Sequence, residues 1–524
     1  MRDFETPGRS AVFATEGMCA TSHPLAAKVA LDLLQQGGNA VDAAIGAAVL
    51  LGLCEPQMTG IGGDCFVLLK PAGEERIVTL NGSGRAPAAL DAADLRARGM
   101  GSVPVHGPEA VSLPGAIDAF CTLSADWGKL DMAQTLAPAI HYAETGIPVA
   151  PRVAHDWGQP DHVRGAARRF YMSDDTPLRM GQLFRAPGQA EVLRRVAQKG
   201  RAGFYEGEVA QDMIDSLRAM GGVHTLDDLA ATRCTYGDPI QSQYRGLDLF
   251  EHAPNGTGAV ASLILNILEH FDLGSLDPLG SERAHLEAEA TKLAYDARNR
   301  FIGDPDHTTR LAHMLAPETA AKLAALIDPR RVLPDVAPLT EAIHRDTVYI
   351  TVVDRDRMAV SLIYSIFHSF GAGLASDRFG ILFQNRGAGF TLAEGHPNEL
   401  KGGKRPMHTI IPAMLGEGGR ITMPFGVMGG PYQPVGHARV VTNLRDYGME
   451  LQAALDAPRA FAENGTLSLE TGYPSATAQA LADLGHQIIP SPGPRGGAQA
   501  IRIHDSGILE GASDPRKDGC ALGY

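Results

Sequence analysis

The residue best suited to nucleophilic chemistry lies in the segment HRDTVYITVVDRDRMAVSLIYS, where Thr347 follows a charged run and opens an alternating apolar stretch. A hydroxyl is a weak nucleophile, and it attacks a carbonyl carbon effectively only when a base lies beside it. Threonine is also common at the start of ordinary strands. Local context alone therefore favours a structural strand residue at Thr347 and leaves a catalytic role open.

Other catalytic and cofactor motifs do not occur in the sequence. It has no complete GxSxG, HExxH, P-loop or GxGxxG pattern, so a nucleophile elbow, a zincin site and a nucleotide-binding loop have no support. The 18 histidines are scattered and show no metal-ligand spacing. None of the six cysteines forms a CxxC pair, so a zinc or redox site is equally unsupported.

The N-terminal part of the chain predicts two helices followed by a strand pair. Leu25–Gln36 carries apolar residues at helical spacing, whereas Ala40–Leu53 is apolar on every side and should be buried. Phe66–Leu69 and Ile77–Leu80 have the pattern of a hairpin.

The middle of the chain, from Asp131 to Ile327, is predicted to be mainly helical, and Glu282–Arg300 is its clearest helix. The C-terminal third predicts strands at Asp346–Asp354, Met358–Tyr364, Ile381–Gln384, Ile410–Leu415 and Thr422–Phe425, with helices near Ala438–Asp446 and Ala476–Gly485. Helices before strands, with a strand pair near the N-terminus, favour sheets covered by helices in a layered α/β arrangement.

Composition restricts the class of protein. The 524 residues are 44% hydrophobic and 20% charged, as in soluble globular proteins, and form two lobes or one large layered domain. The net charge of −14 and the lack of a basic cluster argue against a nucleic-acid partner. The longest apolar stretch, Ala43–Leu53, is too short to span a membrane. No signal-peptide pattern precedes it, so we expect a cytoplasmic protein without a membrane partner.

Four ordered blocks resemble the γ-glutamyltranspeptidase family of N-terminal nucleophile hydrolases, and together they span nearly the whole chain. The blocks are GMCATSHPLAAKVALDLLQQGGNAVDAAIGAAVLLGLCEPQMTGIGGDCFVLL, HLEAEATKLAYDARNRFIGDP, KRPMHTIIPAML and FGVMGGPYQP. The family's nucleophile begins a T-x-x-x-(S/T)-V-V-D run, to which TVYITVVD from Thr347 to Asp354 is similar. The resemblance implies an α/β fold, a four-layer αββα sandwich.

The resemblance also implies that the chain cleaves itself between Asp346 and Thr347. The Thr347 hydroxyl would attack the Asp346 carbonyl, and water would resolve the resulting ester. The α-amino group thus released has an ordinary pKa of about 7.7–8, so it can serve as the base beside the hydroxyl. We expect a large chain of residues 1–346 and a small chain of residues 347–524, held together in one intertwined catalytic domain. A homodimer of such heterodimers is possible.

Further catalytic positions carry over from the same resemblance. Gly429 and Gly430 match paired glycines whose backbone N–H groups form an oxyanion hole, where a residue without Cβ lets the backbone approach closely. A plain Gly-Gly turn is the alternative. Ser365 falls where the family has a threonine that bonds the nucleophile, and Thr351 matches as well, although a simple strand residue explains it equally. Because the protein supplies nucleophile, base and oxyanion donors, we expect no metal and no organic cofactor.

The pocket that selects the acyl group departs from the family pattern. In NGSGRAP the family's carboxylate-binding arginine position holds Ser83, with Arg85 two residues on, and a Ser-Ser pair is replaced by His408 and Thr409. Arg85, His408 and Thr409 are therefore candidate substrate contacts. The sequence does not decide whether His408 is a pocket donor or a packing residue.

Two further departures change the expected charge of the pocket. The family's asparagine position holds Phe367, and in LFQNRGAGF the positions that bind a substrate ammonium group hold Arg386 and Gly389. Phe367 would make the pocket smaller and drier, and a dry pocket strengthens an arginine–carboxylate pair. The substrate is therefore expected to carry a carboxylate and no α-ammonium group, and to be small. Arg386 as a structural salt-bridge residue is the alternative.

These departures resemble a branch of the family that includes oxamate amidohydrolases. We accordingly expect hydrolysis of a small anionic amide through an acyl-enzyme, with oxamate giving oxalate and ammonia as the leading candidate. The alternatives are a γ-glutamyltransferase or glutathione hydrolase, and an acylase for glutaryl-type groups. An unprocessed binding protein without activity is the non-enzymatic alternative.

Overall fold

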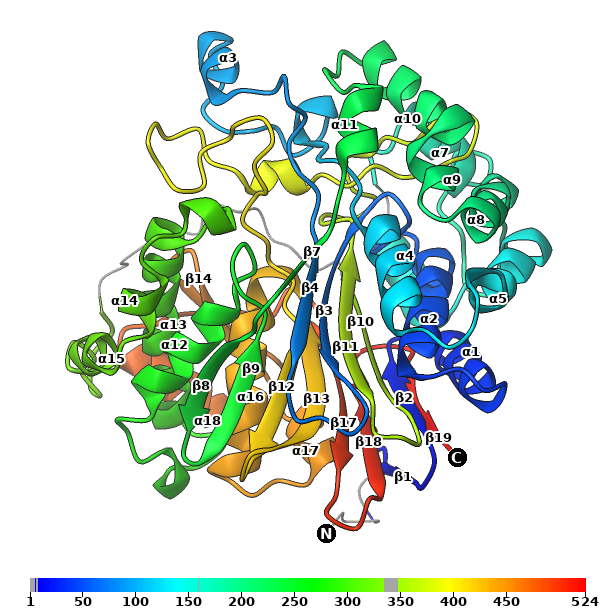
Figure 1. The fold of residues 1–524 in the computed structure, drawn as a ribbon. Helices are drawn as coiled ribbons and strands as arrows, with labels where there is room; N and C mark the ends of the chain where they lie inside the picture. Colours follow the sequence, from blue (N-terminus) through cyan, green and yellow to red (C-terminus); the bar gives the residue numbers. More distant parts are fainter. Residues whose placement is uncertain (1–4, 6–7, 159, 334–346) are drawn as a thin grey trace.

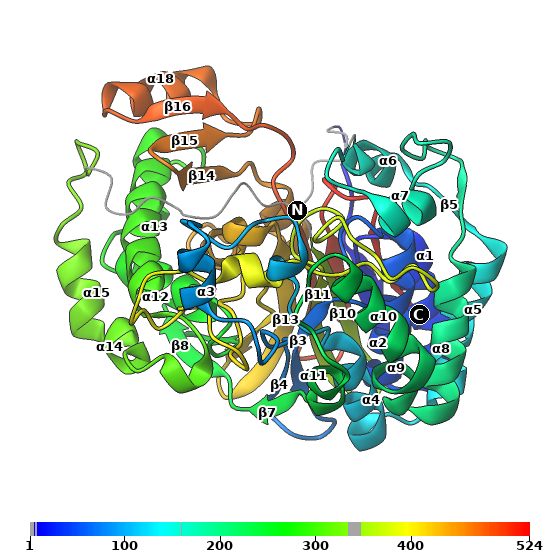
Figure 2. The ribbon, with the colours of Figure 1, turned by 90° about the horizontal axis from the view of Figure 1, so that it is seen from above.

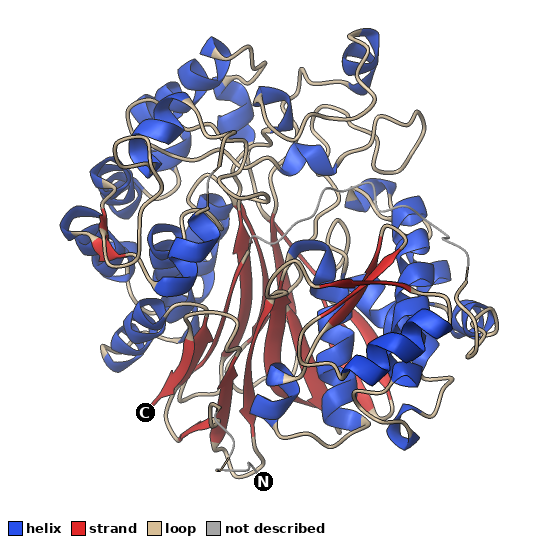
Figure 3. Cartoon of the chain, turned by 180° about the vertical axis from the view of Figure 1, so that it is seen from behind, coloured by secondary structure: helices blue, strands red, loops and turns tan. Residues whose placement is uncertain are grey.

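The computed structural model describes residue 5 and residues 8–158, 160–333 and 347–524. Within this part of the chain, two seven-stranded antiparallel sheets pack face to face, and helices cover the outer face of each (Figure 1). The view from behind shows the same layers, with the strands in red between helices in blue (Figure 3). The predicted four-layer αββα fold is confirmed.

The strand that directly follows Thr347 lies in the interior of one of these sheets, with neighbours on both sides. The order of this sheet is β19 (Cys520–Gly523), β2 (Met18–Thr21), β10 (Val348–Val353), β11 (Ala359–Ser365), β3 (Asp64–Lys70), β4 (Val78–Gly82) and β7 (Thr235–Gly237). The predicted hairpin corresponds to β3 and β4, which pair antiparallel.

The second sheet lies against the first. Its order is β1 (Val12–Ala14), β18 (Leu509–Ser513), β17 (Gly497–Ile503), β13 (Arg420–Met428), β12 (Ala413–Glu417), β9 (Leu247–Glu251) and β8 (Ile240–Tyr244). Each sheet combines strands that precede Thr347 with strands that follow it. Breaking the bond before Thr347 would therefore leave both sheets intact, because strand pairing and burial hold the two segments together.

Separate sets of helices cover the two sheets. The sheet that contains β10 packs against α1 (Pro24–Gln35), α2 (Ala40–Cys54), α4 (Ala116–Trp127), α5 (Met132–Thr145) and α8 (Pro187–Lys199) through one large apolar cluster. The other sheet packs against α12 (Gly258–Leu268), α13 (Ser281–Phe301), α16 (Gln433–Arg445) and α17 (Leu451–Asp456). Every residue of α2 is buried, as its uniformly apolar sequence predicted.

Smaller elements surround this core. A three-stranded sheet of β14 (Ala460–Glu463), β15 (Thr466–Leu469) and β16 (Gln487–Pro490) carries α18 (Ser475–Asp483) and packs on α13 (Figure 2). The remaining elements are α3 (Ala92–Ala97), α6 (Pro151–Trp157), α7 (Gly165–Tyr171), α9 (Ala202–Tyr205), α10 (Gly207–Ala219), α11 (Leu226–Ala231), α14 (Leu311–Leu315), α15 (Pro317–Ala324), β5 (Ile147–Pro148) and β6 (Leu183–Phe184).

The alternating pattern after Thr347 has a clear origin. Val348, Ile350 and Val352 point into the helical layer and belong to its apolar cluster. Tyr349 and Val353 point to the opposite face, where they pack between the two sheets. Strand β10 is thus buried on both faces, as a central strand of a sandwich must be.

Three predictions about secondary structure differ from the fold. The region predicted as mainly helical also contains short strands, namely β5 and β6, the edge strands β7 and β8, and β9, which pairs with β8 and β12. Residues 381–384 form no strand, because their apolar side chains fill the helical layer while only Leu382 forms an isolated bridge, with Ala375. Helix α16 begins at Gln433, before the predicted start at Ala438.

None of the helices in the described ranges combines the length and the apolar character of a bilayer span.

Candidate active site

Strand register brings three polar residues to one end of the first sheet. Val348 pairs with Tyr364, which places Thr347 opposite Ser365, and Ser365 pairs in turn with Asp64 on β3. On the facing sheet, β13 ends at Met428, which packs against the neighbourhood of β10 in a cluster between the sheets. Residues far apart in the sequence therefore meet where these strands end.

Thr347 is enclosed at this end of the sandwich. It is 1% exposed, and its Oγ1 lies 3.4 Å from Nε2 of Gln433, a hydrogen-bond donor at the start of α16. The predicted cleavage partner, Asp346, lies outside the described residues. Thr351 is also buried, four residues further along the same face of β10. Burial fits a plain strand residue equally well, and its assignment to catalysis stays a prediction.

The Gly429–Gly430 turn follows β13 and leads into α16 through a short 3-10 turn, Gly430–Tyr432. Gly429 has φ 122° and Gly430 has φ 55°, a backbone conformation that favours glycine. A Cβ atom on Gly429 would stand 2.9 Å from Cα of Gly496. The turn therefore needs glycine for both conformation and space, which suits the predicted oxyanion hole.

Arg386 is fully buried next to Ser365. It donates from Nη1 to Oγ1 of Thr409 at 2.9 Å and from Nη2 to Oγ of Ser365 at 3.4 Å. Its guanidinium carbon lies 3.9 Å from the centre of the Phe367 ring. The structure thus brings together four of the predicted residues, and it places the guanidinium beside the residue opposite Thr347.

Asp64 is a buried member of this cluster that sequence reasoning missed. Its carboxylate accepts hydrogen bonds from the backbone N–H of Gly84 at 2.8 Å, from Nε2 of Gln384 at 2.7 Å and from Nε2 of His408 at 3.1 Å. Burial raises the pKa of Asp64 to about 6, while the charge of Arg386 opposes the rise. The signal in the sequence that could have indicated this role is a carboxylate directly after the glycine-rich run GIGG, at the start of β3.

His408 belongs to the same network as a neutral ring. Burial, together with the charges of Arg386 and His252, holds the pKa of His408 well below its usual range. Its Nε2–H therefore donates to Asp64, and Nδ1 accepts weakly from the backbone N–H of Ile410 at 3.4 Å. His408 thus makes a buried polar contact with Asp64, and its role as a substrate contact stays a prediction.

Arg85 lies apart from this cluster. Its guanidinium donates to the carbonyl oxygen of Gly403 at 2.8 Å and lies 3.8 Å from the carboxylate of Asp304, with 39% of the side chain exposed. Ser83 instead accepts a hydrogen bond from Asn255 in a buried network. Of the two candidate anion-binding arginines, Arg386 is the one beside Ser365.

Phe367 has an unusual backbone conformation. Its φ is 79°, which costs a non-glycine residue free energy and recurs at functional sites. Flanking hydrogen bonds hold it there: its N–H donates to Oγ of Ser365 at 2.9 Å, and His368 exchanges two bonds with the side chain of Asn385. The ring is thereby fixed between Arg386 and the ring of His368.

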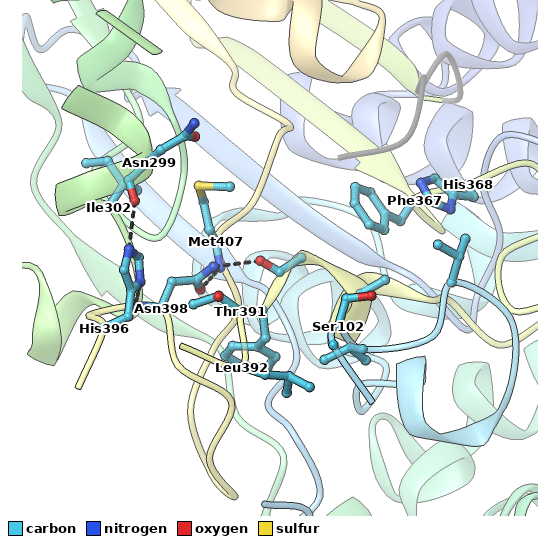
Figure 4. Close-up of a pocket in the computed structure, with 16 residues that line it drawn as sticks. Ser102, Asn299, Ile302, Phe367, His368, Thr391, Leu392, His396, Asn398 and Met407 are labelled. Atoms are coloured by element: carbon cyan, nitrogen blue, oxygen red, sulfur yellow. Dashed lines mark hydrogen bonds between the residues drawn. The ribbon is translucent and has the colours of Figure 1, made fainter. Parts of the chain in front are cut away.

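A pocket of about 290 Å³ adjoins this cluster, and its lining includes Phe367, whose ring contacts Arg386, together with Gly389 and Met407, the residue before His408. Figure 4 shows Phe367 and His368 on one side of it, with Asn299 and His396 on the other. Its lining in the described chain includes no Asp, Glu, Lys or Arg. Burial and nearby positive charge lower the pKa of His368 to about 3, so this ring is neutral.

One pH effect follows from Asp64. Its ionised carboxylate offsets the charge of Arg386, so protonation below pH about 6 should strengthen the binding of an anionic substrate. KM for such a substrate should therefore fall as the pH is lowered from about 7.5 to about 5.5. If Thr347 begins a cleaved chain, as the sequence predicts, kcat should fall as well, because its α-amine becomes protonated. Steady-state kinetics over this range test the split, and a KM that rises with acidity would contradict it.

A second polar cluster, on α13 and a neighbouring segment, has the donor types of a metal site. Ligand atoms of His285, Glu289 and His486 lie within 4.8 Å of one another. The two imidazoles bond to each other, however, and His285 also bonds to the carbonyl oxygen of Asp328. Glu289 pairs with Lys292. We assign these residues the structural role of joining α13 to the segments around it.

Comparison with known proteins places these features in context. The family model described as gamma-glutamyltranspeptidase matches residues 26–524. A glutathione hydrolase-like proenzyme of Bacillus subtilis is 33% identical over 536 residues, covering 98% of this chain and 99% of that protein. The oxamate amidohydrolase proenzyme of Klebsiella pneumoniae is 34% identical over 532 residues, with 98% and 99% covered. The crystal structure of cephalosporin acylase from Bacillus halodurans matches with a TM-score of 0.93 and 37% identity, covering 100% of this chain and 99% of that one.

Proposed function

The chain belongs to the gamma-glutamyltranspeptidase family, and we propose that it is a self-processing threonine amidohydrolase for small amides that carry a carboxylate. Cleavage before Thr347 would give chains of residues 1–346 and 347–524. The observation that carries this proposal is the buried guanidinium of Arg386, hydrogen-bonded to Ser365, the residue opposite Thr347 in the strand register. A substrate carboxylate bound there would place its amide next to the nucleophile.

The charge balance of the pocket supports a substrate without an α-ammonium group. Asp64 is the carboxylate nearest to Arg386 in the network, and its two oxygens already accept from Gly84, Gln384 and His408. Gly389 offers no side chain for an ammonium group. Burying an unpaired ammonium ion is costly, so a γ-glutamyl group should bind poorly.

The reaction proceeds in two acyl transfers. The α-amine of Thr347 takes the hydroxyl proton as Oγ attacks the amide carbon, and the Gly429 and Gly430 N–H groups stabilise the oxyanion. The proton passes to the leaving nitrogen, which departs as ammonia or an amine, and an ester to Thr347 remains. Water then attacks the ester, Oγ regains its proton, and the second product is a carboxylic acid.

Two substrate classes fit this site. Oxamate is the leading candidate because of the likeness to the oxamate amidohydrolase proenzyme. Glutaryl-type amides, the substrates of an acylase, are the second class, and the size of the pocket favours this second class. Its volume of about 290 Å³ could hold roughly ten waters at about 30 Å³ each, far more than oxamate requires. Its uncharged lining suits an apolar leaving group.

A panel of three amides tests the proposal. We expect the purified protein to release ammonia from oxamate or p-nitroaniline from glutaryl-p-nitroanilide. For γ-glutamyl-p-nitroanilide, kcat/KM should be at least about 100-fold lower than for the glutaryl probe, as an unpaired buried charge costs several kcal/mol. The oxamate and glutaryl results decide between the two classes. A preference for the γ-glutamyl probe would contradict the account of Arg386 and Gly389.

A further inference from the structure

The side-chain amide of Gln433 has a defined orientation. Gln433 is fully buried, and its Oε1 accepts a hydrogen bond from the backbone N–H of Ile411 at 2.9 Å. A peptide N–H can only donate, so the atom that faces Ile411 must be the oxygen. The NH₂ group therefore faces the other way, and it lies 3.4 Å from Oγ1 of Thr347.

The helix that carries Gln433 is anchored one turn later by His437. Nε2 of His437 accepts from the backbone N–H of Val427 at 3.1 Å, and Nδ1 donates to Glu251 at 2.7 Å. Strand β12 pairs with β13 only as far as Phe425. Beyond that point the imidazole of His437, instead of a strand, accepts the backbone N–H of Val427. His437 thus fixes α16 to the end of β13, next to the Gly429–Gly430 turn, and Gln433 fixes the start of the same helix to Ile411, just before β12.

We propose that Gln433 is a further catalytic residue, which donates a hydrogen bond to Oγ of Thr347 when that atom leaves the ester. The proposal rests on Thr347 being the nucleophile. When water resolves an ester of Thr347, the bond between the acyl carbon and Oγ breaks, and its electron pair goes to Oγ. An N–H donor stabilises the negative charge that develops there before the proton arrives. Catalytic hydrogen bonds are commonly long before the reaction and shorten during it.

This role differs from that of the oxyanion donors, because it acts on one half of the reaction. In the first transfer Oγ is the attacking atom and a nitrogen leaves, so a donor on Oγ gives little assistance. In the second transfer Oγ is the leaving atom. The same holds for self-cleavage, in which water resolves an ester between Asp346 and Thr347. Loss of the donor should therefore slow ester hydrolysis selectively.

The test is the Gln433→Met variant of the full chain, which keeps the side-chain length and removes the donor. With glutaryl-p-nitroanilide as the probe, stopped-flow mixing should give a burst of p-nitroaniline close to one per Thr347, followed by turnover roughly 10²-fold slower than wild type, the scale of one lost donor. Acid quenching followed by mass spectrometry should find the small chain carrying one glutaryl group. If the variant remains uncleaved, hydroxylamine should split it at Thr347, because it attacks accumulated ester.

Gln452→Met is the matched control. Gln452 is another buried glutamine, bonded through both amide atoms to the backbone of Ser513, and its loss should change neither the burst nor the turnover. A Gln433→Met variant that is slow without accumulating either ester, or that equals wild type, overturns the proposal. If wild type forms no ester on Thr347 with either glutaryl-p-nitroanilide or oxamate, the proposed function itself fails, and the two failures are thereby distinguished.

Discussion

Replacement of Thr347 by alanine is expected to leave one full-length chain with no measurable amidase activity. The methyl group has no oxygen with which to attack either the Asp346 carbonyl or a substrate amide. Removal of a catalytic nucleophile typically costs about 10⁶-fold in kcat. Denaturing electrophoresis reports processing, and the release of p-nitroaniline or ammonia reports turnover. Wild type should give two bands of unequal mass.

Two variants make the result specific to the hydroxyl. Thr347→Ser keeps a hydroxyl and should process, although more slowly. Thr79→Ala removes a buried threonine from β4 of the same sheet, and both its processing and its activity should match those of wild type. Full processing of Thr347→Ala would exclude this residue as the nucleophile.

The second large effect is expected at Arg386. Replacement by methionine removes the cation proposed to hold the substrate carboxylate. Truncating one partner of a buried charge pair costs about 2–5 kcal/mol, which is roughly 30- to 3,000-fold in kcat/KM. The measurement compares glutaryl-p-nitroanilide with butyryl-p-nitroanilide, which has the same chain without the distal carboxylate. Wild type should prefer the glutaryl probe, and the variant should lose that preference.

The ratio of the two probes separates recognition from structure. If Arg386 only supported the fold, the activity toward both probes would fall together and their ratio would stay constant. Arg405→Met is the matched control, because Arg405 is also buried but donates to the backbone oxygens of Ser83 and Arg233. This variant can lose stability, yet its preference for the glutaryl probe should persist.

Much of the architecture could be predicted because local pattern and environment agree. The uniformly apolar stretch at Ala40–Leu53 became α2, buried on all sides. The alternation after Thr347 became a central strand with two buried faces. Residues 381–384 misled the prediction, because an apolar run also fits a loop whose side chains fill the space under helices. Periodicity alone cannot separate these two cases.

The candidate site was harder to predict because its contacts span long sequence separations. Asp64 meets Gln384 across 320 residues and Gln433 meets Thr347 across 86, and a sequence without strand register cannot pair them. The local sequence around Asp64 and around Gln433 indicates neither of these contacts. Likewise, the sequence offered both Arg85 and Arg386 as anion ligands, and only the structure places Arg386 beside Ser365 and Arg85 at a partly exposed position beside Gly403.

The most direct test of the central claim is the identity of the first residue of the small fragment. The purified protein should be separated by denaturing electrophoresis and the smaller band sequenced from its N-terminus. The account predicts Thr-Val-Tyr-Ile-Thr, starting at Thr347. A fragment that begins at any other residue, or a full-length chain that stays intact while it hydrolyses substrate, would contradict it.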